Sequence, residues 1–154
     1  MDYHNIKNWK FPEVDQTYTE NDSILYALGI GFGQEPTNPQ QLKYVYEKNM
    51  QTFPTMAVVV GYPGFWMKDP KAGVNWVKLV HGEQRLKIHR PLPTSGRVIG
   101  RGRITHVIDK GADKGALVLS ERTLEDPEGN LYVTMNSTTF CRGDGGLSQS
   151  DEAP

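Results

Sequence analysis

Residues 96–126 read GRVIGRGRITHVIDKGADKGALVLSERTLED. Two runs in this stretch, 96–110 and 115–126, are rich in β-branched residues and partly alternate apolar with polar positions. That pattern is typical of strands with one buried face. Residues 109–115, DKGADKG, are rich in glycine and aspartate and indicate a turn. The stretch therefore predicts two adjacent antiparallel strands.

The same pattern continues on both sides. VKLVHGEQRLKIHR (77–90) precedes it, NLYVTMNSTTFCRG (130–143) follows it, and PLPTSG and DPEGN supply the turns. Turns at this spacing predict a consecutive antiparallel sheet of four strands. Long strands with one apolar face leave edges that need covering or pairing, so we expect a dimer-like association.

The part before the sheet contains one clear helix signal. Thr19 is suited to the N-cap with Asp22 three residues on, apolar residues follow at helical spacing, and glycines begin at Gly29. This predicts a helix over residues 20–28, and LKYVYEKNM (42–50) predicts a further short amphipathic turn or two. A helix followed by an antiparallel sheet predicts an α+β domain with helical material on one face of the sheet.

The segment between these parts is irregular. An apolar run at 56–60 is followed by GYPGFWMKDPKAGVNW (61–76), in which glycines and prolines break any period. Such a segment is either a loop packed over a cleft or an irregular piece of core. Trp66 and Trp76 accordingly either line an apolar pocket or belong to plain core.

Length and charge narrow the class of protein. The 154 residues suit one domain, placed at 1–146, and the polar end 147–154 is expected to be a linker or tail. Because 17 basic residues face 18 acidic ones, no nucleic-acid or membrane-surface partner is expected. No apolar run approaches a membrane span and no signal peptide is evident, so we expect a soluble protein that is not secreted. A single cysteine, Cys141, excludes an internal disulfide and a cysteine-based zinc site.

Three groups of residues are candidates for chemistry. His81 and Glu83 are two apart and share a face if their strand is regular, which suits a general base and its orienting partner, although a solvated strand pair has the same spacing. Lys110 lies beside glycines, where an ammonium could reach a phosphate, although surface lysines in turns are common. The glycines of RGDGG (142–146) could offer backbone N–H groups to an anion or could simply form a flexible strand exit.

A set of motifs in order resembles one known family. YTENDSILYALGIG, LKYVYE, FPTMAVVVG, LVHGEQRLKIHRPLPTSG, VIDKG and RGDGG, within residues 17–146, are similar to the N-terminal half of type 2, (R)-specific enoyl-CoA hydratases of the MaoC-like group. The resemblance implies a hot-dog fold, a curved antiparallel sheet partly wrapped around a helix, that pairs into a double hot-dog. The irregular residues 61–76 stand where a complete hot-dog has its central helix, which suits an enlarged acyl tunnel.

The resemblance also implies a role. In that family the C-terminal unit carries a Gly-Asp-x-Asn-Pro-x-His motif that activates water, and this chain lacks it: Gly143-Asp144 is followed by Gly-Gly-Leu, and Asn38-Pro39 lacks both acid and histidine. The implied role is to bind acyl-CoA through His81, Gly82 and Lys110, with no cofactor and no metal, beside a catalytic hot-dog subunit or a missing C-terminal half. The expected location is cytoplasmic, or peroxisomal if the chain is part of a longer eukaryotic protein.

Two other functions remain open from the sequence. One is a homodimeric hot-dog acyl-CoA thioesterase that uses Glu83 or Asp22 as its own acid or base. The other is a non-enzymatic subunit that binds acyl-CoA and leaves a partner's turnover unchanged.

Overall fold

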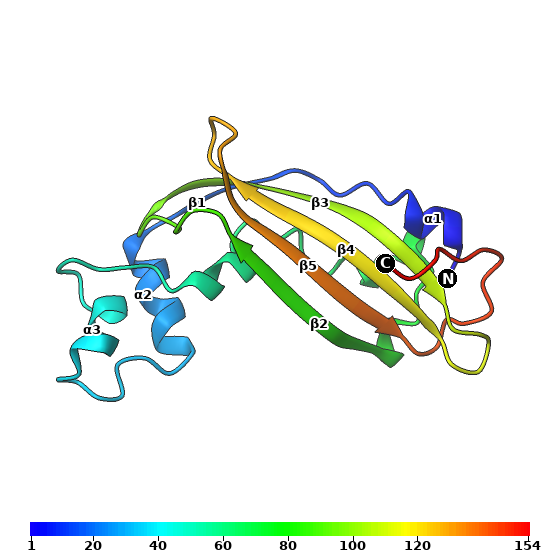
Figure 1. Ribbon diagram of the computed structural model, residues 1–154, viewed down its shortest axis with the longest axis horizontal. Coiled ribbons are helices and arrows are strands. Elements are labelled where there is room, and N and C mark those ends of the chain that lie inside the picture. Colours follow the sequence, from blue (N-terminus) through cyan, green and yellow to red (C-terminus); the bar gives the residue numbers. More distant parts are fainter.

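The computed structural model describes all 154 residues as one curved antiparallel sheet with short helices around it (Figure 1). The helices are α1 (Tyr3–Lys7), α2 (Glu20–Gly29) and α3 (Pro39–Val45). Four 3-10 helices follow: η1 (Pro54–Val58), η2 (Trp66–Lys68), η3 (Pro70–Ala72) and η4 (Trp76–Lys78). The strands are β1 (Val14–Tyr18), β2 (Leu79–Ile88), β3 (Gly96–Asp109), β4 (Ala116–Glu125) and β5 (Leu131–Cys141).

The strand order is β1-β3-β4-β5-β2, and every neighbouring pair is antiparallel. The four strands predicted from the sequence are all present, and the curved antiparallel sheet of the predicted fold class is confirmed. The predicted consecutive order is wrong for β2, which pairs with β5 and not with β3. The prediction missed the fifth strand, β1, which pairs with the first half of β3 from Val14 opposite Gly100 to Tyr18 opposite Gly96. The order leaves β1 and β2 as the two edges of the sheet.

The predicted helix is also present. Thr19 caps α2 through the Asp22 N–H, and the Asp22 carboxylate accepts from the Thr19 N–H at 2.7 Å, which completes a capping box. The helix does not cover the sheet. It projects with α3 from one end, and the chain termini lie near the other end (Figure 1). The helical cover over the inner face comes instead from the 3-10 helices of residues 54–78.

Two apolar clusters pack the 3-10 segment onto the sheet. The first joins Met56, Ala57 and Val60 to strand residues such as Leu124 and Val133. The second joins Met67, Ala72 and Val74 to the opposite ends of β3, β4 and β5 and includes Ile6 of α1. Each cluster buries its side chains almost completely, so the two together hold the segment against the sheet at both ends.

Two glycines bring the segment close to the sheet. A Cβ on Gly100 would lie 2.2 Å from the Gly61 carbonyl oxygen, so only glycine fits at this point of β3. Gly61 itself has φ +59°, and its N–H donates to the Gln16 side chain at 2.7 Å. Backbone therefore touches backbone between the 3-10 segment and the sheet.

The end of the chain packs on the domain as far as Asp151. Leu147 contacts the second cluster, and the Asp151 N–H donates to the Val107 carbonyl at 2.8 Å. The Asp151 carboxylate accepts hydrogen bonds from Lys7, Tyr3 and the Val107 N–H. Partial burial alone would raise the pKa of Asp151, but these hydrogen bonds outweigh it and lower the pKa to about 2. Residues 147–151 thus share the packing of the domain.

Candidate functional site

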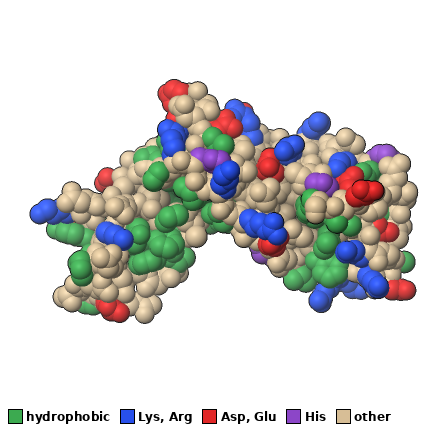
Figure 2. Space-filling view, viewed as in Figure 1, with side chains coloured by type: hydrophobic (Ala, Val, Ile, Leu, Met, Phe, Trp, Pro, Cys, Tyr) green, Lys and Arg blue, Asp and Glu red, His purple; other side chains and the backbone are tan.

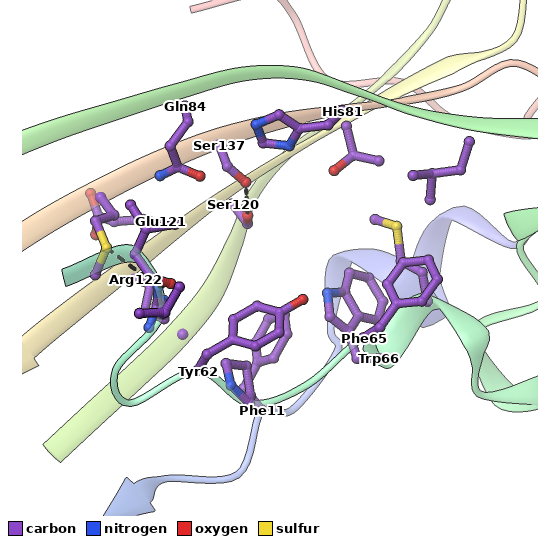
Figure 3. A pocket seen from close by; sticks show the side chains of 18 residues that line it. Phe11, Tyr62, Phe65, Trp66, His81, Gln84, Ser120, Glu121, Arg122 and Ser137 are labelled. Atoms are coloured by element: carbon purple, nitrogen blue, oxygen red, sulfur yellow. Dashed lines mark hydrogen bonds between the residues drawn. The ribbon is translucent and has the colours of Figure 1, made fainter. Parts of the chain in front are cut away.

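A cavity of about 490 Å³ lies between the middle of the sheet and the 3-10 segment, with 18 residues around it (Figure 3). The sheet forms its floor. The chain from η1 to η2 forms its roof together with Phe11. The cavity lies between the two apolar clusters, where the inner face of the sheet carries polar instead of apolar side chains.

That change can be followed along the strands. On β4 the inward positions are Val118, Ser120, Arg122 and Leu124. The first and the last of them are buried apolar residues. On β5, Ser137 and Thr139 lie between buried Met135 and Cys141 in the same way. His81 and Gln84 of β2 and Gly102 of β3 complete the floor. The floor is therefore a polar band within an otherwise apolar sheet face.

The roof is apolar. It contains Val58, Val59, Tyr62, Pro63, Phe65, Trp66 and Met67. The centre of the Trp66 ring lies 4.8 Å from that of Trp9 and, edge-on, 5.2 Å from that of Phe11. These ring contacts hold the roof in place. Trp66 lines the cavity, as one alternative from the sequence had it, whereas Trp76 lies outside and contacts Phe65. The roof supplies apolar surface of the kind that accepts hydrocarbon.

The prediction that His81 and Glu83 share a face is wrong. His81 pairs with Thr139 and Glu83 with Thr138, so Gly82 is an extra residue in β2, a bulge that reverses the alternation. His81 consequently faces the cavity. Glu83 points to the other face, where it binds Arg85 at 2.8 Å. The two side chains cannot act together as a base and its orienting partner.

The other residues singled out in the sequence lie away from the cavity wall. A Cβ on Gly82 would lie 3.1 Å from the Thr138 carbonyl oxygen, so this glycine lets the bulge pack closely on β5. Lys110 is exposed just beyond β3, and its backbone N–H donates to the Gly115 carbonyl. The structure thus places His81 in the cavity and Lys110 outside it. Their predicted contacts with a ligand stay predictions.

The glycine-rich exit of β5 has a packing role. A Cβ on Gly145 would lie 2.0 Å from the Gly111 carbonyl oxygen, so the loops at 111–115 and 143–146 require glycine where they meet. The Asp109 carboxylate already accepts from the N–H groups of Gly111 and Gly146. An aspartate of the chain itself therefore already accepts from one N–H of this stretch, that of Gly146. The strand-exit interpretation of these glycines fits best.

The carboxylates considered for a thioesterase are engaged elsewhere. Glu83 faces away from the cavity, and Asp22 belongs to the capping box of α2, where the backbone N–H and the hydroxyl of Thr19 lower its pKa. Glu121 is among the residues that line the cavity, but its carboxylate pairs with Arg103 at 2.8 Å on the outer face. No carboxylate of these three stands beside His81.

Sequence reasoning missed most residues of the floor, among them Arg122. Its guanidinium donates to the Val60 carbonyl at 2.7 Å and the Val58 carbonyl at 2.6 Å, and lies 5.5 Å from the centre of the Tyr62 ring. Burial lowers the pKa of Arg122 to about 10. The signal was present in the alternation of residues 118–124, where Arg122 occupies an inward position.

Comparison with known proteins identifies the family. The model of the MFE-2 hydratase 2 N-terminal domain matches residues 16–143. The chain belongs to this family. The family comprises parts of (R)-specific enoyl-CoA hydratases of the type found in multifunctional enzyme 2, and the resemblance drawn from the sequence motifs is confirmed.

Two curated relatives show how much of a longer protein this family member matches. Enoyl-CoA hydratase ChsH3 of Mycobacterium tuberculosis is 33% identical, over 94% of this chain and 54% of that protein. The peroxisomal enoyl-CoA hydratase 2 of Arabidopsis thaliana is 36% identical, over 93% of this chain and 48% of that protein. The chain spans about half the length of these relatives.

Solved structures confirm the fold of the family member. A MaoC-like dehydratase from Phytophthora capsici superposes with a TM-score of 0.74 at 28% identity, covering 98% of this chain and 53% of that one. Full-length peroxisomal multifunctional enzyme type 2 from Drosophila melanogaster gives a TM-score of 0.67 at 32% identity, covering 92% and 25%. The fold is the MaoC-like hot-dog.

The same fold occurs in the HadBC and ChsH1-ChsH2 complexes of Mycobacterium tuberculosis, each of which combines two different proteins. Among the helices of this chain, none has the length and apolarity to cross a bilayer.

Proposed function

We propose that this chain is the substrate-binding half of an (R)-specific 2-enoyl-CoA hydratase, which adds water to trans-2-enoyl-CoA and forms (3R)-3-hydroxyacyl-CoA. A partner hot-dog supplies the catalytic aspartate and histidine. One observation carries the proposal: the hot-dog of this chain encloses an apolar-roofed cavity lined by His81, and the carboxylates of Glu83 and Glu121 are paired with arginines.

The missing acid–base pair supports a binding role over a catalytic one. Hydration needs a group that activates water at Cβ and a group that delivers a proton to Cα. His81 lines the cavity, but Glu83 and Glu121 are paired with arginines on the other face. The chain also has no Gly-Asp-x-Asn-Pro-x-His motif. Both proton transfers are therefore assigned to the partner.

In the proposed mechanism this chain positions the substrate. The acyl group enters the cavity under the apolar roof, with His81 and Gly82 near the thioester side and Lys110, exposed outside, available to the anionic part of CoA. Binding energy from the remote acyl chain then holds Cβ and Cα against the partner's catalytic groups. Backbone N–H groups of the partner stabilise the enolate-like oxygen. No cofactor is needed, since the CoA thioester is the substrate.

The partner is proposed to pair along β2. This strand is an edge of the sheet, has ten residues and contains no proline, so its outer backbone groups can extend the sheet into a second unit. Val77, Val80 and Ile88 expose apolar side chains along this edge. The partner is either a separate subunit or the remainder of a longer chain, as the length of the relatives suggests. A homodimer through the same edge is the competing arrangement.

The proposed cellular location depends on whether this chain is part of a longer protein. Two kinds of relatives carry a peroxisomal name. A peroxisomal location is proposed if this chain belongs to a longer eukaryotic enzyme, and a cytoplasmic location otherwise.

The test is a hydration assay with crotonyl-CoA and longer trans-2-enoyl-CoA thioesters. The chain is assayed alone and with a catalytic hot-dog unit taken from a relative that contains the Gly-Asp-x-Asn-Pro-x-His motif. We expect no hydration by the chain alone and hydration of the longer substrates by the pair beyond that of the catalytic unit alone. Hydration by the chain alone would refute the assignment.

The same samples test the two other functions. A thioesterase would release free CoA from saturated acyl-CoA and lose this activity in Glu83→Ala. A non-enzymatic binding subunit would bind acyl-CoA in calorimetry but leave the turnover of the catalytic unit unchanged for every chain length.

A further inference from the structure

One cation faces the cavity without an anionic partner. Arg122 has no carboxylate within 4.0 Å, whereas Arg97, Arg101 and Arg103 on the outer face of the sheet are all paired with acidic residues. Burial lowers the pKa of Arg122, so the absence of a counter-charge is costly here. A buried charge of this kind lowers stability unless other contacts offset its loss of hydration.

Part of the offset comes from the protein itself. The Nη1 and Nη2 groups donate to carbonyls at the end of η1, those of Val58 and Val60, and Ala57 is also within reach at 3.4 Å. These contacts hold the roof to the floor of the cavity. The Nε–H has no acceptor in the protein, and Nε is not among the atoms that are buried without a partner. The guanidinium therefore keeps donor capacity at the cavity wall.

Arg122 lies opposite Met135 of β5, and polar side chains follow further along the floor. Ser120 and Ser137 contact each other at 3.2 Å, and Gln84 lies on the adjoining strand β2 (Figure 3). Thr139 lies on β5 with Ser137 and also lines the cavity. A purely hydrocarbon acyl chain would satisfy the apolar roof and displace water from these groups without replacing its hydrogen bonds. The floor suits a ligand that has oxygen on the side facing the sheet.

The positive charge of Arg122 favours a ligand oxygen that carries a negative charge. Glu121, the nearest acidic residue in the chain, turns to the outer face and pairs with Arg103. The cavity therefore contains an arginine charge with no protein anion to balance it. A carboxylate would supply the missing charge and accept from the free N–H groups, and hydroxyls of the floor could donate to its second oxygen.

We propose that the cavity selects acyl-CoA substrates whose acyl group carries a carboxylate remote from the thioester, and that Arg122 is the residue that binds this carboxylate. The inference rests on the proposed acyl-CoA binding and names the substrate class of the same site. Hydrogen bonds to charged groups contribute about 1.5–3 kcal/mol, so the preference over an unsubstituted chain of equal length should be about tenfold to a hundredfold.

The test is calorimetric binding of matched CoA thioesters to the full chain. The pairs are hexanoyl and adipoyl, decanoyl and sebacoyl, and hexadecanoyl and hexadecanedioyl, with the ω-hydroxy analogue of each length as a third ligand. We expect the carboxylated member to bind tighter in at least one pair and the hydroxy analogue to bind no better than the unsubstituted chain. Arg122→Met should abolish this preference, and Arg122→Lys should keep a reduced one. The control Arg103→Met, on the outer face, should keep it in full.

The outcomes separate the two levels of the argument. Equal binding of all three ligands at every length by the unmodified chain would overturn the carboxylate preference and leave acyl-CoA binding intact. A preference that the hydroxy analogue shares equally, or that survives in Arg122→Met, would also overturn it. Absence of binding by every thioester would overturn the proposed function itself. The measurement on the unmodified chain decides even if Arg122→Met fails to fold, which circular dichroism would report.

Discussion

The contact between Gly61 and Gly100 predicts that a methyl group in place of one Cα hydrogen of Gly100 disturbs the roof of the cavity. In Gly100→Ala the new Cβ would lie 2.2 Å from the Gly61 carbonyl oxygen and 3.0 Å from its carbon. An ordinary contact begins near 3.4 Å, so the roof or the strand must move by about 1.2 Å. The contacted atoms are backbone on both sides, so no side-chain rotation can relieve the overlap.

The movement would stretch two hydrogen bonds at the same place. Gly61 donates to Gln16 at 2.7 Å, and Arg122 donates to the neighbouring Val60 carbonyl at 2.7 Å. Overpacking costs about 1–3 kcal/mol and a weakened bond from a charged donor about 1.5 kcal/mol more. We expect the free energy of unfolding to fall by about 2.5–4.5 kcal/mol. For a domain of this size that lowers the melting temperature by about 5–18 °C.

Thermal and urea unfolding followed by circular dichroism measure this loss. The matched control is Gly29→Ala, since a Cβ at Gly29, at the end of α2, meets nothing within 4 Å. That substitution should leave stability unchanged or raise it slightly, because alanine favours helix. Equal melting temperatures for the two variants would show that the roof is not seated on β3 as described. Acyl-CoA affinity should also fall in Gly100→Ala and not in the control.

Three further predictions concern single residues. Because the folded state lowers the pKa of Asp151 to about 2, its contribution to stability should be complete above about pH 5 and lost as the pH falls from about 4 toward 2. Asp151→Asn should therefore cost about 1–2 kcal/mol at pH 7 in urea titrations and much less near pH 2, whereas Asp113→Asn, in an exposed turn, should cost nothing at either pH. His81→Ala should weaken acyl-CoA binding about tenfold in calorimetry without changing the melting temperature, and unchanged affinity would remove His81 from the binding site. Burial raises the pKa of Cys141 to about 12, so iodoacetamide should modify this thiol only after unfolding; rapid labelling of the native protein would contradict the packing of the second cluster.

Much of the architecture was predictable because its signals are local. The β-branched alternation of residues 96–126 and its flanks predicted β2 to β5, and Thr19 with Asp22 predicted the start of α2. The motif set also predicted the family and the fold, which the family model and the solved structures confirm. Strand β1 escaped prediction because VDQTY is short and has few apolar residues, and it is a strand only through its hydrogen bonds to the edge of β3.

The site was less predictable because it depends on which residues face each other. Alternation in a regular strand would have placed His81 and Glu83 together, and the extra residue Gly82 separates them. On the sequence alone, the glycines at 143–146 could have bound an anion. In the structure the Asp109 carboxylate accepts from the N–H groups of Gly111 and Gly146. Arg122 had the inward parity of Val118 and Leu124, yet no sequence signal placed the cleft expected beside residues 61–76 over this position.

The sequence by itself determined the strands, the capped helix, the family and the absence of a hydration motif, since each of these is encoded in neighbouring residues along the chain. Tertiary structure alone decided that the 3-10 segment covers the sheet while α2 projects from its end, that a bulge turns His81 inward, and that Arg122 meets the cavity without a carboxylate. The physical reason is that facing depends on register and on close backbone packing between distant segments. A shift of one residue reverses every side chain that follows it.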